Sequence, residues 1–183
     1  DVLENVSQSL FNYIHSPNTY SKEEFDNLHQ DISMRFMNSF NQIIEGQAST
    51  VSRKNEKTGR NEIVQIKMSG IRYGQAQKLI NLSFKWLYCM DGADKYLERF
   101  KHCHVALDRV TYSAGWYHKD VNQNVICSNW SSLDLEEYRS VQSDFLQYIN
   151  RSKYKTDSGE HLTPFQAEFY AWDEYYTVIQ NNH

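Results

Sequence analysis

Apolar residues recur every three or four positions over most of the chain, which is the spacing of an amphipathic α-helix. The clearest helical stretch begins with Ser21 and Glu24, which have the spacing of a capping box. Near the C-terminus Thr163 and Gln166 bracket a proline and form a second complete helix start. The pattern predicts helices within residues 3–14, 21–46, 75–90, 131–149 and 163–179, with shorter pieces near 96–100 and 108–114.

The pattern changes between residues 49 and 68. A polar stretch, residues 54–61, separates two short runs rich in β-branched residues, Thr50-Val51-Ser52 and Ile63-Val64-Gln65-Ile66. This arrangement is typical of a two-stranded hairpin, and a flexible loop is the alternative. We therefore expect a mainly α fold in which residues 1–183 form a single helical domain, with residues 49–68 as a small β-hairpin or loop insertion.

The composition is that of a folded chain, since 40% hydrophobic and 14% aromatic residues exceed what a disordered chain carries. No stretch approaches the roughly 20 apolar residues that a membrane helix needs, and the first residues do not have the pattern of a secretory signal. The cysteines, 3 in number, lack a CxxC spacing, which argues against a disulfide framework and a zinc knuckle. We expect a cytoplasmic protein without a membrane partner.

Several common catalytic fingerprints are missing from the sequence. It contains no P-loop, nucleophile-elbow or zinc-protease motif, and no kinase or dinucleotide-binding fingerprint. The sequence therefore gives no reason to expect a cofactor or a resident metal.

Charge is unevenly distributed along the chain, whose formal net charge is −4. Residues 51–101 contain 11 Lys and Arg against 5 Asp and Glu, whereas the remaining residues contain 8 against 18. Aromatic residues such as Tyr73, Phe84 and Trp86 are interleaved with these cations. The segment is typical of a surface that contacts phosphates, so we expect DNA as the first candidate partner. The alternative is that the cations solvate exposed helix faces and pair with acidic neighbours.

Histidines gather at His102 and His104, on either side of Cys103, and His118 follows further on. Imidazole and thiolate are zinc ligands, but no second ligand pair with a recognised spacing follows, so we expect ordinary hydrogen-bonded histidines. Arg99 and His104 have the spacing of an Arg-x4-His motif, and this pair resembles that of the HEPN ribonucleases, in which Arg and His serve RNA cleavage. A ribonuclease is therefore a third hypothesis for the function.

Gly70 and Gly74 bracket a turn ahead of the predicted helix 75–90, and the run His104-Val105-Ala106-Leu107-Asp108 follows that helix. In the order of these parts, residues 69–116 resemble the helix-hairpin-helix DNA glycosylase superfamily. In that family a glycine-bearing hairpin leads into a helix with the lyase lysine, and a loop with the catalytic aspartate follows. The chain departs from the family in the spacing of its glycines and in Ala106, which stands where the family has proline.

The resemblance implies that Lys78 or Lys85 attacks C1′ of a deoxyribose as an amine, and that Asp108 stabilises the developing charge or moves protons. It also implies that Gly70 and Gly74 allow backbone amides to approach a phosphate.

The leading hypothesis is nucleic-acid binding with DNA base-excision or lyase-like chemistry. Its catalytic residues would be Lys78, Lys85 and Asp108, and its nucleic-acid-binding residues Arg60, Lys67, Gly70, Arg72 and Gly74. The alternative is a non-catalytic helical module that docks a protein partner through the aromatic face of the predicted helix 163–179. These hypotheses differ on whether the chain is an enzyme.

Overall fold

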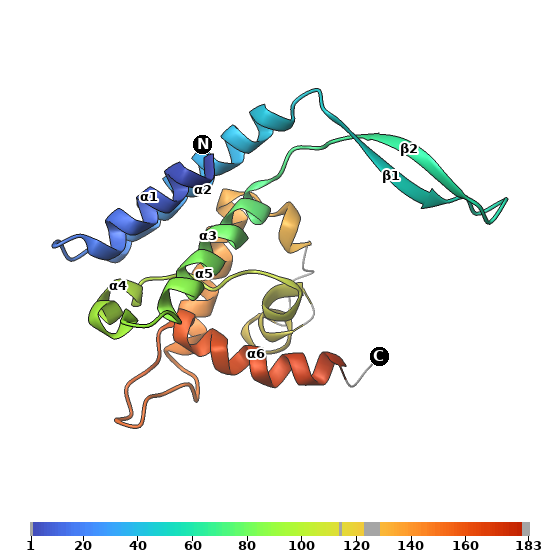
Figure 1. Cartoon of the computed structure of the whole chain (residues 1–183). Coiled ribbons are helices and arrows are strands. Elements are labelled where there is room, and N and C mark those ends of the chain that lie inside the picture. The colour runs from blue at the N-terminus through green and yellow to red at the C-terminus, as the bar shows by residue number, and fades with distance from the viewer. Residues whose placement is uncertain (1, 114, 123–128, 181–183) are drawn as a thin grey trace.

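The computed structural model describes residues 2–113, 115–122 and 129–180, with the side chains of 178–180 left out. Its α-helices are α1 (Val2–His15), α2 (Lys22–Ile44), α3 (Tyr73–Tyr88), α4 (Leu97–Phe100), α5 (Leu135–Ile149) and α6 (Pro164–Gln180). Strands β1 (Ala48–Lys54) and β2 (Asn61–Lys67) form a hairpin between α2 and α3. Shorter helical turns are η1 (Ala93–Tyr96), η2 (Arg109–Ser113), η3 (Tyr117–Val121) and η4 (Trp130–Ser132). The mainly α fold with a small β-hairpin is thus confirmed (Figure 1).

The helix starts follow from local hydrogen bonds that the sequence predicts. At α2 the Glu24 amide donates to Ser21 Oγ at 3.2 Å, and the Ser21 amide donates to the Glu24 carboxylate at 2.7 Å. Thr163 and Gln166 make the same reciprocal pair at α6, and α5 starts in this way at Asp134. Each box pairs amides that a helix start leaves without an internal acceptor. The predicted starts of α2 and α6 are therefore confirmed.

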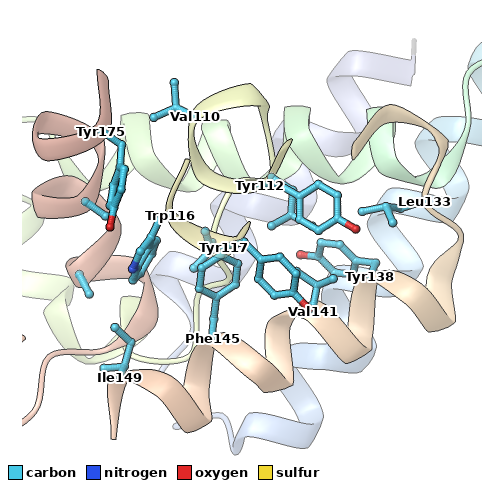
Figure 2. Packing of buried hydrophobic residues seen from close by; sticks show 14 of the residues in the cluster. Val110, Tyr112, Trp116, Tyr117, Leu133, Tyr138, Val141, Phe145, Ile149 and Tyr175 are labelled. Atoms are coloured by element: carbon cyan, nitrogen blue, oxygen red, sulfur yellow. The ribbon is translucent and has the colours of Figure 1, made fainter. Parts of the chain in front are cut away.

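One cluster of buried apolar side chains lies between α5, α6 and residues 105–117. Figure 2 shows Trp116 and Tyr117 against the face of α5 that carries Val141 and Phe145. The ring centres of Trp116 and Phe145 are 4.6 Å apart, and those of Tyr117 and Phe145 are 5.3 Å apart. This packing holds Trp116 and Tyr117 against α5. Both lie in a part of the chain for which the spacing of apolar residues predicts no helix or strand.

A second cluster joins α1, α2 and α3. Tyr13, Phe25 and Phe84 supply one ring from each of these helices, with centres 5.4 to 5.7 Å apart. Phe165, in the first turn of α6, also belongs to this cluster, whereas Ala171 further along α6 belongs to the other. Helix α6 therefore ties the two clusters together. None of the described helices is long and apolar enough to cross a membrane.

The hairpin stands away from the helices (Figure 1). Its strands pair antiparallel, with Val51 opposite Val64 and Lys54 opposite Asn61. Every residue of β2 is exposed, and in β1 only Val51 is half-buried. Within the described chain neither strand has a further strand beside it. We call this element, residues 48–67, the hairpin arm; of the two predictions for this region, the hairpin is the correct one.

An extended stretch of backbone, residues 103–107, runs through the middle of the helices, and we call it the core segment. All of its residues are buried. Both backbone groups of Val105 are paired with one side chain, since the Val105 amide donates to Gln142 Oε1 at 3.0 Å and Gln142 Nε2 donates to the Val105 carbonyl at 2.8 Å. Asn81 Nδ2 reaches the same carbonyl at 3.2 Å. Side chains of α5 and α3 thus take the place of a neighbouring strand.

The next residue of the core segment is held in the same way. The Ala106 amide donates to Glu168 Oε2 at 3.0 Å, and Thr111 Oγ1 donates to the Ala106 carbonyl at 2.7 Å. Helix α6 and turn η2 therefore complete the set of side chains that satisfy this backbone.

Replacement of Gln142 by leucine should destabilise the protein by about 2 to 4 kcal/mol, because it leaves the Val105 amide buried without a partner and weakens the pairing of its carbonyl. Urea denaturation measures the change. Gln147→Leu, at an exposed position of the same helix, is the matched control and should change the free energy of unfolding by less than about 0.5 kcal/mol. Equal effects of the two variants would contradict this account of the core segment.

Candidate functional site

The hairpin arm concentrates positive charge. It carries the cations Arg53, Lys54, Lys57, Arg60 and Lys67 against the carboxylates of Glu56 and Glu62. Most of these charges lie at or near the turn, residues 55–60, which Asn55 shapes by accepting from the amides of Lys57 and Thr58. The predicted binding residues Arg60 and Lys67 are both exposed on this arm.

The turn between the arm and α3 contains the predicted binding residues Gly70, Arg72 and Gly74. Arg72 is exposed at the start of α3, where its amide donates to Gln75 Oε1 at 3.0 Å. A strand precedes this turn, where the helix-hairpin-helix arrangement has a helix.

Gly70 and Gly74 are close-packing positions in this structure. A Cβ atom on Gly74 would lie against the backbone of Trp130, and the Gly74 amide donates to the Leu133 carbonyl at 3.0 Å. A Cβ atom on Gly70 would lie 2.8 Å from Asn41 Oδ1. The Gly74 amide is therefore already paired within the protein, whereas Gly70 and the Arg72 side chain are exposed.

Lys78 and Asp108, two of the predicted catalytic residues, lie side by side. Lys78 Nζ is 3.8 Å from Asp108 Oδ2 and 4.6 Å from the centre of the Trp130 ring. The other carboxylate oxygen of Asp108 accepts from the amides of Val110 and Thr111 at 2.8 and 2.9 Å, which caps turn η2. Asp108 thus serves the local fold with one oxygen and faces an amine with the other.

Lys85, the other predicted nucleophile, has a different partner. Its Nζ is 2.8 Å from Glu168 Oε1, and the Glu168 side chain is 1% exposed. Burial raises the pKa of the Glu168 carboxyl to about 7, although Lys85 and the Ala106 amide lower it. The structure therefore places Lys78, and not Lys85, beside Asp108, and gives Lys85 a role in the support of the core segment.

A buried polar network, which the sequence pattern does not predict, surrounds His104. His104 Nε2 lies 2.8 Å from Asp26 Oδ1, and His104 Nδ1 lies 2.8 Å from the Tyr138 hydroxyl. The same hydroxyl is 2.9 Å from Asn81 Nδ2, and Asn81 Oδ1 is 2.8 Å from His29 Nε2. The network thus joins α2, α3, α5 and the core segment.

The network determines where its protons lie. Asn81 Nδ2 faces the Val105 carbonyl, which can only accept, so Asn81 Oδ1 must accept from His29 Nε2–H. Tyr138 accepts from Asn81 and donates to His104 Nδ1, and His104 Nε2–H then donates to Asp26. Both imidazoles are neutral in this pattern, which burial favours because it lowers the pKa of His29 well below its ordinary value and also lowers that of His104.

A cavity of about 280 Å³ opens beside this network. Its lining includes Lys22, Asp26, His29, Tyr73, His104, Tyr138 and Arg139. Burial would raise the pKa of Asp26, but hydrogen bonds from His104 and Lys22 outweigh it and hold that pKa at about 2. The cavity is therefore lined by one ionised carboxylate, two neutral imidazoles and two cations at physiological pH.

One member of this network, His29, could have been identified from the sequence. His29 lies four residues after Phe25 and three before Ile32, on the buried stripe of α2, where a polar side chain needs a partner. The partners come from distant parts of the chain, and only the fold brings them to it.

Arg99 and His104, the pair with the ribonuclease-like spacing, have separate environments. Arg99 donates to the carbonyls of Ser16 and Asn18 and fixes the connection between α1 and α2. His104 faces Asp26 and Tyr138 instead. The described residues include no group of three or more His, Cys, Asp or Glu side chains placed to hold a metal ion, and Cys127 lies outside them.

Most of the predicted aromatic stripe of α6 packs into the protein. Phe165 and Tyr175 are buried, whereas Tyr170 and Tyr176 are exposed. The side chain of Ile179, at the end of the predicted helix 163–179, lies outside the described part. The protein-partner hypothesis therefore has two exposed rings on α6 to support it, rather than a continuous apolar face.

Comparison of the chain with protein families, with curated proteins and with solved structures gives no match. The function is therefore argued from the geometry and chemistry of this chain.

Glu168→Gln should gain stability relative to the unsubstituted protein as the pH rises from about 4.5 to about 7. A carboxyl whose pKa is raised on folding binds its proton more tightly in the folded state. Between these two pH values the unfolded chain releases that proton first, so the unsubstituted protein loses stability as the pH rises. The expected change in the difference is about 3 kcal/mol over this range, measured by urea denaturation at several pH values. Glu98→Gln, at a side chain that is 83% exposed, is the control and should give a constant difference. Parallel pH profiles for Glu168→Gln and the unsubstituted protein would overturn the assignment.

Proposed function

We propose that this protein binds nucleic acid, with the hairpin arm as the principal contact. The observation that carries the proposal is a basic two-stranded ribbon that stands clear of the helical body, with its cations exposed. Exposed cations that are not buried in ion pairs are free to neutralise phosphates and release counterions.

The dimensions of the arm suit a groove of a duplex. Strands of 7 residues are about 20 Å long, and two paired strands lie about 5 Å apart. The major groove of B-DNA is about 12 Å wide and admits a two-stranded ribbon. The arm is therefore long enough and narrow enough to enter the groove.

The two faces of the arm differ in chemistry. Residues that pair directly across the strands share a face, so Val51, Val64 and Ile66 lie together on one face, next to the pair Arg53 and Glu62. The opposite face is mainly polar and carries Ala48, Thr50, Ser52, Lys54, Asn61, Ile63, Gln65 and Lys67. Lysine, amide and hydroxyl side chains are those that contact phosphates and base edges, so we assign this polar face to the nucleic acid.

The charge distribution supports one orientation of binding. Outside residues 51–101 the chain has 8 Lys and Arg against 18 Asp and Glu, which repels a polyanion. The arm and Arg72 at its base would therefore face the nucleic acid, with the acidic parts of the body turned away. The exposed free thiol of Cys89 supports a reducing compartment such as the cytoplasm.

A variant with Lys54, Lys57 and Arg60 all changed to Gln should bind a fluorescent DNA duplex more weakly. The slope of log affinity against log salt concentration should also become shallower by about 2 to 3, since about 0.9 is lost with each phosphate contact. Fluorescence anisotropy at a series of salt concentrations measures both quantities.

The matched control changes Lys95, Lys153 and Lys155 to Gln, which removes the same charge from exposed positions of the body. It should keep the slope of the unsubstituted protein. An equal loss in both variants, or no salt-dependent binding by the unsubstituted protein, would refute the assignment to the arm.

Strand incision at abasic sites is a second candidate function, and the approach of Lys78 to Asp108 favours it. A lysine amine beside a carboxylate can attack the ring-opened C1′ aldehyde, with the carboxylate accepting a proton as the Schiff base forms and water leaves. Lys78 is half-buried with its Nζ over the Trp130 ring and lies on α3, the helix that follows the arm.

Borohydride trapping on duplex DNA with an abasic site tests this candidate, because the reductant converts a Schiff base into a stable adduct. The adduct should form with the unsubstituted protein and with Lys95→Ala, and should be lost in Lys78→Ala. Loss in Lys85→Ala alone would make Lys85 the nucleophile. Absence of any adduct would remove the lyase activity and leave binding by the arm intact.

A further inference from the structure

We propose that the cavity beside His29 and His104 is a binding site for a phosphate group. It lies between α2, α5 and the core segment, and its lining residues are distinct from those of the hairpin arm. The inference therefore does not depend on nucleic-acid binding by the arm.

Two cations from different helices lie at the open side of the cavity. Lys22 is in the first turn of α2 and Arg139 is on α5, and both are exposed to solvent. One Arg139 nitrogen, Nη2, donates to Gln30 Oε1 at 2.6 Å, which orients the guanidinium and leaves its other N–H groups for a ligand. A planar guanidinium with several donors suits an oxyanion better than a neutral ligand.

The inner wall of the cavity offers a third contact. His29 is 1% exposed, and its Nε2–H is committed to Asn81. The imidazole also lines the cavity, and its second nitrogen, Nδ1, is not part of the contact with Asn81. A proton on Nδ1 would turn this nitrogen into a donor for a ligand oxygen and make the ring a cation.

The carboxylate in the cavity pairs with one of these two cations, Lys22, and leaves Arg139 for a ligand. Asp26 Oδ2 is 2.6 Å from Lys22 Nζ, and Asp26 Oδ1 accepts from His104 Nε2, so its charge is already compensated within the protein. The other titratable groups that face His29 are the phenols of Tyr73 on α3 and Tyr138 on α5, and burial raises the pKa of both, which keeps them neutral. An entering anion therefore meets Arg139 as the cation with the most unused donors.

Binding should be coupled to protonation of His29. Burial and the neighbouring His104 disfavour the charged form of His29 in the empty cavity, whereas a bound anion would favour it. A ligand that binds the protonated form binds more tightly as the pH falls. Proton uptake on binding distinguishes this site from a surface patch of lysines, whose charge is constant over the same pH range.

Inorganic phosphate and sulfate are the probes, and the imidazole resonances of His29 and His104 in NMR spectra are the readout. Both anions should shift these resonances saturably, and sulfate, whose own charge is constant, should bind several-fold more tightly at pH 6 than at pH 8. Arg139→Gln should weaken binding about tenfold, as expected for the loss of a charge-assisted hydrogen bond.

Arg35→Gln is the matched control, because Arg35 is an exposed arginine on α2 that pairs with Asp31 and lies outside this cavity. It should bind as the unsubstituted protein does. The proposal is overturned if neither anion gives a saturable shift at pH 6, if chloride at the same ionic strength gives the same shift, or if Arg35→Gln weakens binding as much as Arg139→Gln.

Two further ligands identify the source of the phosphate. An oligonucleotide with a 5′-phosphate and the same strand with a 5′-hydroxyl are added to the arm variant that lacks Lys54, Lys57 and Arg60. Shifts at His29 with the phosphorylated strand alone assign the cavity to strand ends. If inorganic phosphate shifts these resonances and neither oligonucleotide does, the cavity is assigned to a free phosphate or a small phosphorylated metabolite.

Discussion

Extended backbone in the middle of a helical protein has to find hydrogen-bond partners that no sheet supplies. In this chain the core segment crosses between α3, α5 and α6, and the partners are the side chains of Asn81, Gln142 and Glu168. Each of these residues lies on the buried face of its helix. The helices are consequently held at the distances that these hydrogen bonds require, and their apolar residues pack around the same segment.

The core segment also places the chemistry of the molecule. At one end it holds His104 against Asp26 and Tyr138, beside the cavity. At the other end it leads directly into Asp108, which caps η2 and faces Lys78. Because both ends are fixed by the same set of backbone hydrogen bonds, a change in the middle of the segment would be felt on both sides of the protein.

The sequence predicts the helices well because their signals are local. Each capping pair, Ser21 with Glu24 and Thr163 with Gln166, lies within four consecutive residues, and the apolar stripes repeat within each helix. The hairpin was one of two predictions for its region, since its strands have little apolar contact with the body and depend mainly on each other. The buried network could not be predicted, because His29 and Asn81 are separated by 52 positions and Asn81 and Tyr138 by 57. The resemblance names Lys78 or Lys85 together with Asp108 and does not choose between the two lysines, because the ion pair of Lys85 with Glu168 depends on how α6 crosses α3.

The hairpin arm is closed at its base, where the Met68 amide donates to the Gln47 carbonyl at 3.1 Å. Its residues are exposed along the whole length, so substitutions there disturb few contacts of the helices. The arm can therefore change length, charge and sequence during evolution while the body keeps its fold. The core segment has no such freedom, since the backbone groups of Val105 and Ala106 are paired with side chains of three helices and of turn η2. The arm and the body therefore differ in how much sequence change each tolerates.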